Sequence, residues 1–130
     1  MKFLIFIGFV SLLCTSVSYA EESDYSRQYS MCMERAGGVT LNMLDCFRAE
    51  TKRQDARLNS AYQQTMASLT ATRKKQLQDV QRLWIRYRDA NCGFYADPDG
   101  GSMAGLNSSS CYLDATASRA TELENLREEY

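Results

Sequence analysis

Apolar positions recur at intervals of three, four or seven along two long stretches of the chain, and this spacing predicts amphipathic helices. The first stretch runs from Leu41 to about Leu69 and the second from a cap at Thr70 or Thr72 to about Asn91. The first stripe consists of Leu44, Phe47, Thr51, Leu58, Tyr62, Thr65 and Leu69. The second consists of Leu77, Val80, Trp84, Tyr87 and Asn91. Because the stretches are similar in length and joined by few residues, we predict a long antiparallel helix hairpin.

Two shorter helices are predicted at either side of this hairpin. One covers residues 24–35, with Ser23 as a candidate N-cap, and ends at Gly37-Gly38, after which Thr40 is placed to cap the next helix. The other begins at Cys111 or Tyr112 and ends near Arg127. Its stripe is Leu113, Thr116, Ala120, Leu123 and Leu126. Since no strand-like alternation occurs, the predicted fold class is all-α, a small disulfide-braced helical bundle.

The first 20 residues have the pattern of a secretory signal peptide. Met1 and Lys2 form a basic start, residues 3–14 are apolar, and Ser18-Tyr19-Ala20 places small residues before a cleavage point. The apolar part is too short for a spanning helix. A lipoprotein would use Cys14, but Ser11-Leu12-Leu13 lacks the small residues that such a site needs. We therefore predict cleavage after Ala20 and one periplasmic or secreted helical domain over residues 21–130, without a membrane span.

The predicted mature chain is mildly acidic and rich in cysteine for its size. Without Lys2 it has 14 basic and 16 acidic residues, a net charge of −2, which argues against nucleic acid as a partner. Cleavage removes Cys14 and leaves four cysteines. An even number of cysteines in an exported chain predicts two disulfides. We favour Cys32–Cys46 and Cys92–Cys111, but a crossed pairing such as Cys46–Cys92 stays open. The chain has no histidine and no C-x-x-C pair, so a zinc site is not expected.

Each half of the hairpin carries a dense polar and aromatic signature. The signature residues are Asp55, Leu58, Asn59, Tyr62, Gln81, Trp84, Arg88 and Asp89. If the turn is centred near Thr70, Asp55 lies level with Arg88, and Asn59 with Gln81. We interpret the first pair as a partly buried ion pair and the second as an interhelical hydrogen bond, while Trp84 and Tyr62 belong to the core. The signature is therefore read mainly as a folding signature.

The segment Gly93 to Ser110 has no helical period and is predicted to be an 18-residue loop between two cysteines. Long loops within compact domains often carry function, so it is our candidate partner-binding site, although a solvated loop folded back on the core is an alternative. The candidate contact residues are Tyr95, Asp97, Asp99, Gly100, Gly101, Ser102, Met103 and Leu106. Asp97-Pro98-Asp99-Gly100 lacks the further acidic ligands of a calcium loop, and no metal or other cofactor is expected.

Enzymatic function finds little support in the residue types. There is no histidine to act as a general base, and disulfides would consume the thiols. Two carboxylates can hydrolyse a glycoside, but Asp45, Glu50, Asp55 and Asp89 are scattered over helix faces and mark no cleft. We therefore expect no catalytic residues.

The ordered set of motifs resembles the LprI-like lysozyme inhibitor family of small secreted bacterial helical proteins. It comprises Cys32, Met43-x-x-Cys46, Asp55-x-x-Leu58-Asn59-x-x-Tyr62, Leu77-x-x-x-Gln81-x-x-Trp84, Arg88-Asp89-x-x-Cys92, Gly100-Gly101-Ser102 and Cys111 followed by Thr116-x-x-Arg119-x-x-x-Leu123. The resemblance covers nearly all of the predicted mature chain. It implies a bacterial envelope protein that, in some members, blocks lysozyme.

Two functions follow from this resemblance and the residue pattern. The first is an inhibitor of lysozyme-type cell-wall hydrolases that presents the Gly93–Ser110 segment to the enzyme. The second is a non-inhibitory envelope module that binds another periplasmic protein or a wall component. An exposed apolar patch away from this segment would favour the second.

Overall fold

The computed structural model describes residues 25–129, which form four α-helices. They are α1 (Arg27–Ala36), α2 (Thr40–Ser68), α3 (Ala71–Phe94) and α4 (Gly101–Glu129). No strand occurs within this range, so the all-α prediction is confirmed. The predicted signal peptide lies outside the described residues.

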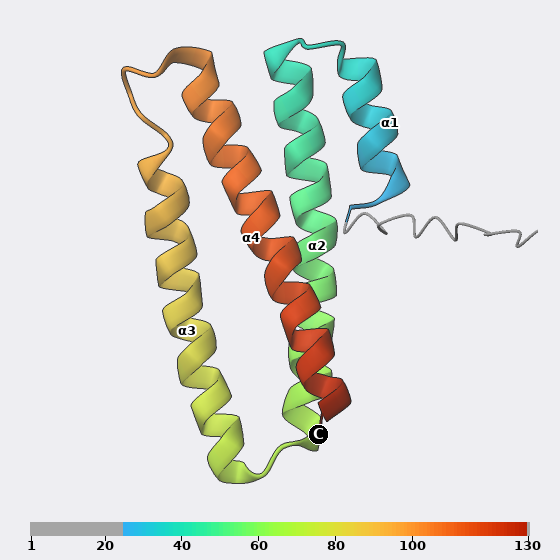
Figure 1. The fold of residues 1–130 in the computed structure, drawn as a ribbon, viewed down its shortest axis with the longest axis vertical. Coiled ribbons are helices and arrows are strands. Elements are labelled where there is room, and N and C mark those ends of the chain that lie inside the picture. The colour runs from blue at the N-terminus through green and yellow to red at the C-terminus, as the bar shows by residue number, and fades with distance from the viewer. Residues whose placement is uncertain (1–24, 130) are drawn as a thin grey trace, which may run out of the picture.

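The helices are arranged as a row in the order α3, α4, α2 and α1 (Figure 1). α2 and α3 run antiparallel and are joined by a short turn at Leu69 and Thr70, as the predicted hairpin requires. α4, however, packs along α2 and also against α3, so it provides most of the contact surface for both arms. The main core cluster accordingly draws on three helices. Its buried members are Leu58, Ala61, Leu77, Ala120 and Leu123.

Small side chains allow α4 to lie close to α2. Ala117 and Ala120 on α4 and Ala61 on α2 are all buried, and such residues permit a short distance between helix axes. The Thr65 hydroxyl donates to the backbone carbonyl of Leu123 at 3.0 Å, which requires this close approach. Arg57 adds two hydrogen bonds to the Glu124 carboxylate, at 2.8 and 2.6 Å. The α2–α4 interface is therefore the main structural contact of the molecule.

The prediction that the last helix begins at Cys111 or Tyr112 is wrong, because α4 already begins at Gly101. Residues 101–110 lack an apolar stripe and are rich in Gly and Ser, which are weak helix formers. Tertiary contacts compensate for this weakness. Ala104 is buried, and the Ser108 hydroxyl donates to the Cys92 carbonyl of α3 at 2.9 Å. The predicted 18-residue loop is thus reduced to a turn between Phe94 and Gly101.

Two of the four helix-end signals predicted from the sequence are used in the structure. Gly37 ends α1 in the left-handed conformation with φ 57°, and the Thr70 hydroxyl caps α3 by accepting from the N–H of Arg73. The proposed caps at Ser23 and Thr40 are wrong. Ser26 caps α1, and Val39 precedes α2 without a side-chain cap.

Both disulfides have the sequential pairing. Cys32–Cys46 joins α1 to α2 with the Cα atoms 5.7 Å apart, and Cys92–Cys111 joins α3 to α4 with the Cα atoms 5.4 Å apart. The crossed alternative is excluded. Each bond therefore fixes one edge helix to the central α2–α4 pair.

Candidate functional site

The two signatures do not pair across the hairpin as predicted, because α4 lies between them. Gln81 is buried and accepts a hydrogen bond from Nε of Arg119 on α4 at 3.0 Å, whereas Asn59 is exposed and donates to Asp55 in its own helix at 3.3 Å. The predicted Asn59–Gln81 hydrogen bond is therefore wrong. Arg119, which the family motif contained without an assigned role, is the buried partner that Gln81 needs.

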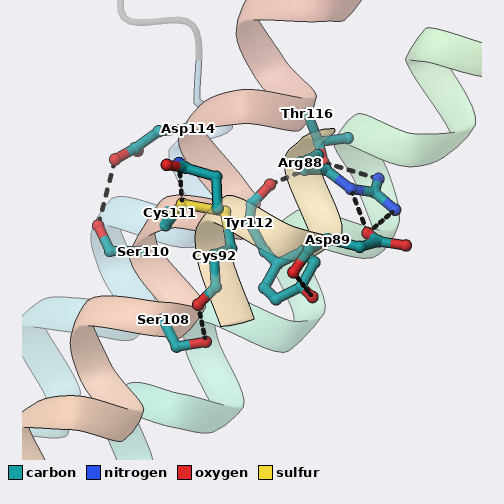
Figure 2. Close-up of a disulfide and its surroundings, with 10 residues drawn as sticks. Arg88, Asp89, Cys92, Ser108, Ser110, Cys111, Tyr112, Asp114 and Thr116 are labelled. Atoms are coloured by element: carbon teal, nitrogen blue, oxygen red, sulfur yellow. Dashed lines mark hydrogen bonds and ion pairs between the residues drawn. A yellow bond between two sulfur atoms is a disulfide. The ribbon is translucent and has the colours of Figure 1, made fainter. Parts of the chain in front are cut away.

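The predicted ion pair between Asp55 and Arg88 is also replaced by local contacts. The Arg88 guanidinium donates to the Asp89 carboxylate at 2.9 and 3.0 Å and approaches the Thr116 hydroxyl of α4 at 3.5 Å (Figure 2). The same guanidinium lies over the rings of Trp84 and Tyr112, 5.0 and 5.5 Å from their centroids, in a cation–π arrangement. Arg88 thus links α3 to α4 and not to α2.

The assignment of Trp84 and Tyr62 to the core is confirmed, since both are partly buried and pack against the main core cluster. Leu58 belongs to the same cluster. Most signature side chains therefore position α4 between α2 and α3. Asp55, Asn59 and Asp89 are the exposed members.

Asp55 and Arg88 both line an open groove of about 680 Å³ between α2, α4 and the end of α3. Its lining is mixed: apolar Leu44 and Phe47, hydroxyls from α4, and three basic side chains. Two of these cations already have carboxylate partners, because Arg48 pairs with Asp45 at 2.8 Å and Arg88 with Asp89. The groove therefore offers little uncompensated charge to a ligand.

The predicted partner-binding segment surrounds a second hollow, the corner pocket, where α3 turns into α4. The corner pocket has a volume of about 610 Å³. It is lined by Gly93, Phe94, Tyr95, Ala96, Asp97, Pro98, Gly100, Met103, Ala104 and Asn107. The rings of Phe94 and Tyr95 meet edge to face with centroids 6.0 Å apart, and both side chains are exposed, as is Met103. The corner thus presents apolar side chains on a backbone held by the Cys92–Cys111 bond.

Four of the eight candidate contact residues line this pocket: Tyr95, Asp97, Gly100 and Met103. The other four, Asp99, Gly101, Ser102 and Leu106, do not, although Asp99 on the turn and Gly101 and Ser102 at the start of α4 are exposed nearby. The Asp97 carboxylate accepts the N–H of Asp99 at 2.9 Å and so stabilises the turn. A Cβ at Gly100 would lie 2.8 Å from that of Ala104, so this glycine is needed for the close start of α4.

A third surface, the outer face of α3, was missed by the sequence reasoning. Val80 and Tyr87, which belong to the predicted apolar stripe, are 49% and 67% exposed, and Leu83 and Phe94 are 63% and 81% exposed. The four lie at intervals of three, four and seven, so they share one side of the helix. The periodicity identified an apolar stripe correctly but could not tell which part α4 would cover. We refer to Val80, Leu83, Tyr87 and Phe94 as the α3 apolar row.

The titrating groups with shifted pKa values lie away from these surfaces. Burial alone would raise the pKa of Glu50, but hydrogen bonds from Ser26, Gln54 and Arg53 outweigh it and lower the pKa. The hydrogen bond from Arg57 lowers the pKa of Glu124, against the opposing effect of burial. Burial, with Asp114 and Glu50 nearby, raises the pKa of Tyr29. These groups stabilise helix contacts and do not form an acid–base pair.

Two further findings concern residues 25–129 only. No group of three or more His, Cys, Asp or Glu side chains gathers there in a way that could hold a metal ion. No helix in that range combines the length and apolar character needed to cross a membrane.

Comparison with known proteins identifies the family. The family model described as "Lysozyme inhibitor LprI" matches residues 15–123. An uncharacterized protein of Rhizobium meliloti (strain 1021) is 31% identical over 133 residues, which cover 90% of this chain and 89% of the relative. No solved structure matches. The match includes α1, α2, α3, most of α4 and both disulfides, and the chain belongs to the LprI lysozyme inhibitor family.

Proposed function

We propose that this protein is an exported, non-catalytic inhibitor of lysozyme-type cell-wall hydrolases, acting in the periplasm or outside the cell. The observation that carries the proposal is the match of the lysozyme inhibitor family model over residues 15–123. The predicted signal peptide and the two disulfides agree with an oxidising, extracytoplasmic location. Lysozymes are the enzymes that the protein would meet there.

The proposed contact region includes the α3–α4 corner, from Tyr95 to Leu106. Three features support it. Exposed aromatic and thioether side chains at Phe94, Tyr95 and Met103 are of the types enriched in interfaces. The corner is preorganised by the Cys92–Cys111 bond, which reduces the entropy lost on binding. Finally, Asp97 and Asp99 suit the rim of an interface with a cationic enzyme.

A lysis assay tests the proposal. Purified residues 21–130 are added to lysozymes of several classes, and the clearing of a cell-wall suspension is followed by turbidity. We expect the rate for at least one class to fall with increasing protein and to reach a plateau at equimolar protein. Unchanged rates for all classes at a large molar excess would refute inhibition.

Corner variants then test the contact region. Tyr95→Ala and Met103→Ser remove exposed apolar groups, so inhibition should weaken by about tenfold, as for interface residues of intermediate importance, while the melting temperature stays near that of the unchanged protein. Leu41→Ser on α2 is a matched control, because Leu41 is also exposed but lies outside the corner. Equal inhibition by all three variants would move the site away from the corner.

The non-inhibitory envelope module is the second candidate. The specific observation in its favour is the α3 apolar row, since Val80 and Leu83 form an exposed apolar patch outside the corner. A protein that binds a wall or envelope component through this row would leave the lysis rate unchanged.

A further inference from the structure

α3 differs from the other long helices in how little of it is buried. Only Leu77, Gln81 and Cys92 are buried among its 24 residues, whereas α2 and α4 each bury seven of 29. α3 packs mainly against α4 and forms one edge of the molecule (Figure 1). Its outer side is therefore open to a partner along most of its length.

The open side of α3 combines apolar and basic side chains. Leu83, Arg82 and Arg86 line a shallow hollow together with Asp79. Asp79 is already engaged by Lys75 at 3.2 Å and by Arg82 at 3.9 Å. No ion pair involving Arg86 occurs in residues 25–129, so its charge is available beside the apolar row.

The charge of α3 is opposite to that of the remaining chain. α3 carries six basic and two acidic residues, a net charge of +4. The predicted mature chain has a net charge of −2, so the remaining residues carry −6. The protein is thus acidic overall, with one basic, apolar edge.

We propose that the outer face of α3, formed by the α3 apolar row with Arg82 and Arg86, enters the acidic saccharide-binding cleft of the lysozyme that this protein inhibits. This inference rests on the proposed function. Glycoside hydrolases of the lysozyme type place two carboxyl groups beside the scissile bond. Arg86 is complementary to that negative charge, with Arg82 beside it, while Leu83 and Tyr87 provide apolar contact area in the manner of interface anchors.

The charge distribution allows one enzyme to contact both the acidic body and the basic edge of the inhibitor. A lysozyme is generally cationic with an acidic cleft, so the acidic body of the inhibitor is attracted at long range while the basic edge suits the cleft. The corner residues Asp97 and Asp99 then lie at the rim, next to the basic surface of the enzyme. In this arrangement the α3 apolar row is exposed in the free protein because it contacts the enzyme during inhibition.

A second copy of the chain is a poorer occupant of this face. A symmetric dimer through α3 would place Arg82 and Arg86 of one copy beside those of the other, and like charges in an interface are unfavourable. An anionic membrane surface has suitable charge, and the experiment below separates it from the enzyme cleft.

The test compares two variants on α3 with two matched controls in the lysis assay and in direct binding to the inhibited lysozyme. Leu83→Asp is matched by Leu41→Asp on α2, because both leucines are strongly exposed. Arg86→Glu is matched by Arg27→Glu at the start of α1, on the opposite edge of the molecule. All four should keep the helical circular dichroism spectrum and melting temperature of the unchanged protein. The α3 variants should inhibit at least about tenfold more weakly, a loss typical of interface anchors, and the controls within about twofold, as surface changes away from the interface do.

Two additional arms identify the occupant. A saturating chitooligosaccharide, which fills the cleft of the enzyme, should compete with the unchanged inhibitor. Sedimentation with phosphatidylglycerol vesicles should show no binding that depends on Arg86. The inference is overturned if the unchanged protein inhibits but Leu83→Asp and Arg86→Glu inhibit equally well, or if the saccharide does not compete. Arg86-dependent vesicle binding together with normal inhibition by Arg86→Glu would assign the face to lipid instead. If the unchanged protein inhibits no lysozyme, the proposed function fails and the inference falls with it.

Discussion

The fully buried Glu50 carboxylate on α2 accepts hydrogen bonds from the backbone N–H and hydroxyl of Ser26, at 2.8 and 2.5 Å, and so holds the start of α1. Gln54 and Arg53 each donate to it at 2.9 Å. In the sequence, Glu50 is only one of several carboxylates scattered over helix faces. Its role depends on where α1 folds back, which the apolar pattern does not encode.

Replacing this carboxylate should change both stability and its dependence on pH. Glu50→Gln should lower the unfolding free energy by about 2 kcal/mol at neutral pH, because charge-assisted hydrogen bonds are lost in a buried place. Since the folded pKa of Glu50 lies below the ordinary value of 4.5, its contribution is present above that pH and is lost as the pH falls through the folded pKa. Urea unfolding at several pH values measures both effects.

The comparison between Glu50→Gln and the unchanged protein isolates this group from other carboxylates. Glu124 has a lowered pKa in the same direction, so part of the acid destabilisation should remain in the variant. The stability difference between the two proteins should shrink below about pH 4.5. A difference that stays constant down to pH 2 would contradict the assigned role.

Gln81 and Asn59 provide a second test at the residue scale, because both belong to the signature but only Gln81 is buried. Gln81→Ala removes the acceptor of the buried Arg119 Nε–H and should cost about 2 kcal/mol. Asn59→Ala removes an exposed contact and should cost less than about 0.5 kcal/mol. Chemical denaturation measures the loss of unfolding free energy in each variant. Equal losses would favour a direct Asn59–Gln81 hydrogen bond and contradict the structure.

At the scale of elements, sequence periodicity predicted α2 and α3 well and the first third of α4 poorly. The stripes of α2 and α3 continue over many turns, so their existence and approximate ends could be read directly. Residues 101–110 have no such stripe and become helical through the Cys92–Cys111 bond, the buried Ala104 and the Ser108 hydrogen bond. These contacts come from α3 and the turn, and a local pattern cannot contain them.

Removing the Cys92–Cys111 bond should therefore melt the start of α4. The double replacement of both cysteines by alanine should lower the unfolding free energy by about 3 kcal/mol, as expected for a closed loop of this length. Hydrogen exchange should then show lost protection over residues 101–110. Replacing Cys32 and Cys46 instead should loosen α1 and leave residues 101–110 protected. Loss of protection at residues 101–110 in both variants would contradict the assignment of one helix to each disulfide.

At the scale of the whole molecule, the row of helices produces one thoroughly packed pair, α2 and α4, and two edges that carry different surfaces (Figure 1). The candidate site predicted from the sequence included the α3–α4 turn but not the outer face of α3. The exposure of Val80 and Tyr87 depends on which side of α3 is covered by α4, and an apolar stripe has the same appearance whether it is covered or not. The net charge of the chain does not reveal the basic edge either, because the charge of +4 on α3 is offset by the acidic residues of the remaining chain.

The same charge distribution predicts how binding responds to salt. If α3 lies against an acidic cleft and the acidic body lies against a cationic rim, raising the ionic strength from 0.05 to about 0.5 M should weaken the complex and slow association. Arg86→Glu should show a smaller dependence on salt than the unchanged protein. Calorimetry and stopped-flow association measure this, and an affinity independent of salt would contradict an electrostatically guided complex.

The most direct test of the central claim is a map of the surface that a bound lysozyme covers. Amide hydrogen exchange of residues 21–130 is measured alone and with saturating lysozyme. We expect increased protection concentrated in residues 80–106, which contain the α3 apolar row and the corner, with no change in α1. Protection confined to α1 and the exposed side of α2, or no change at saturating enzyme, would contradict it.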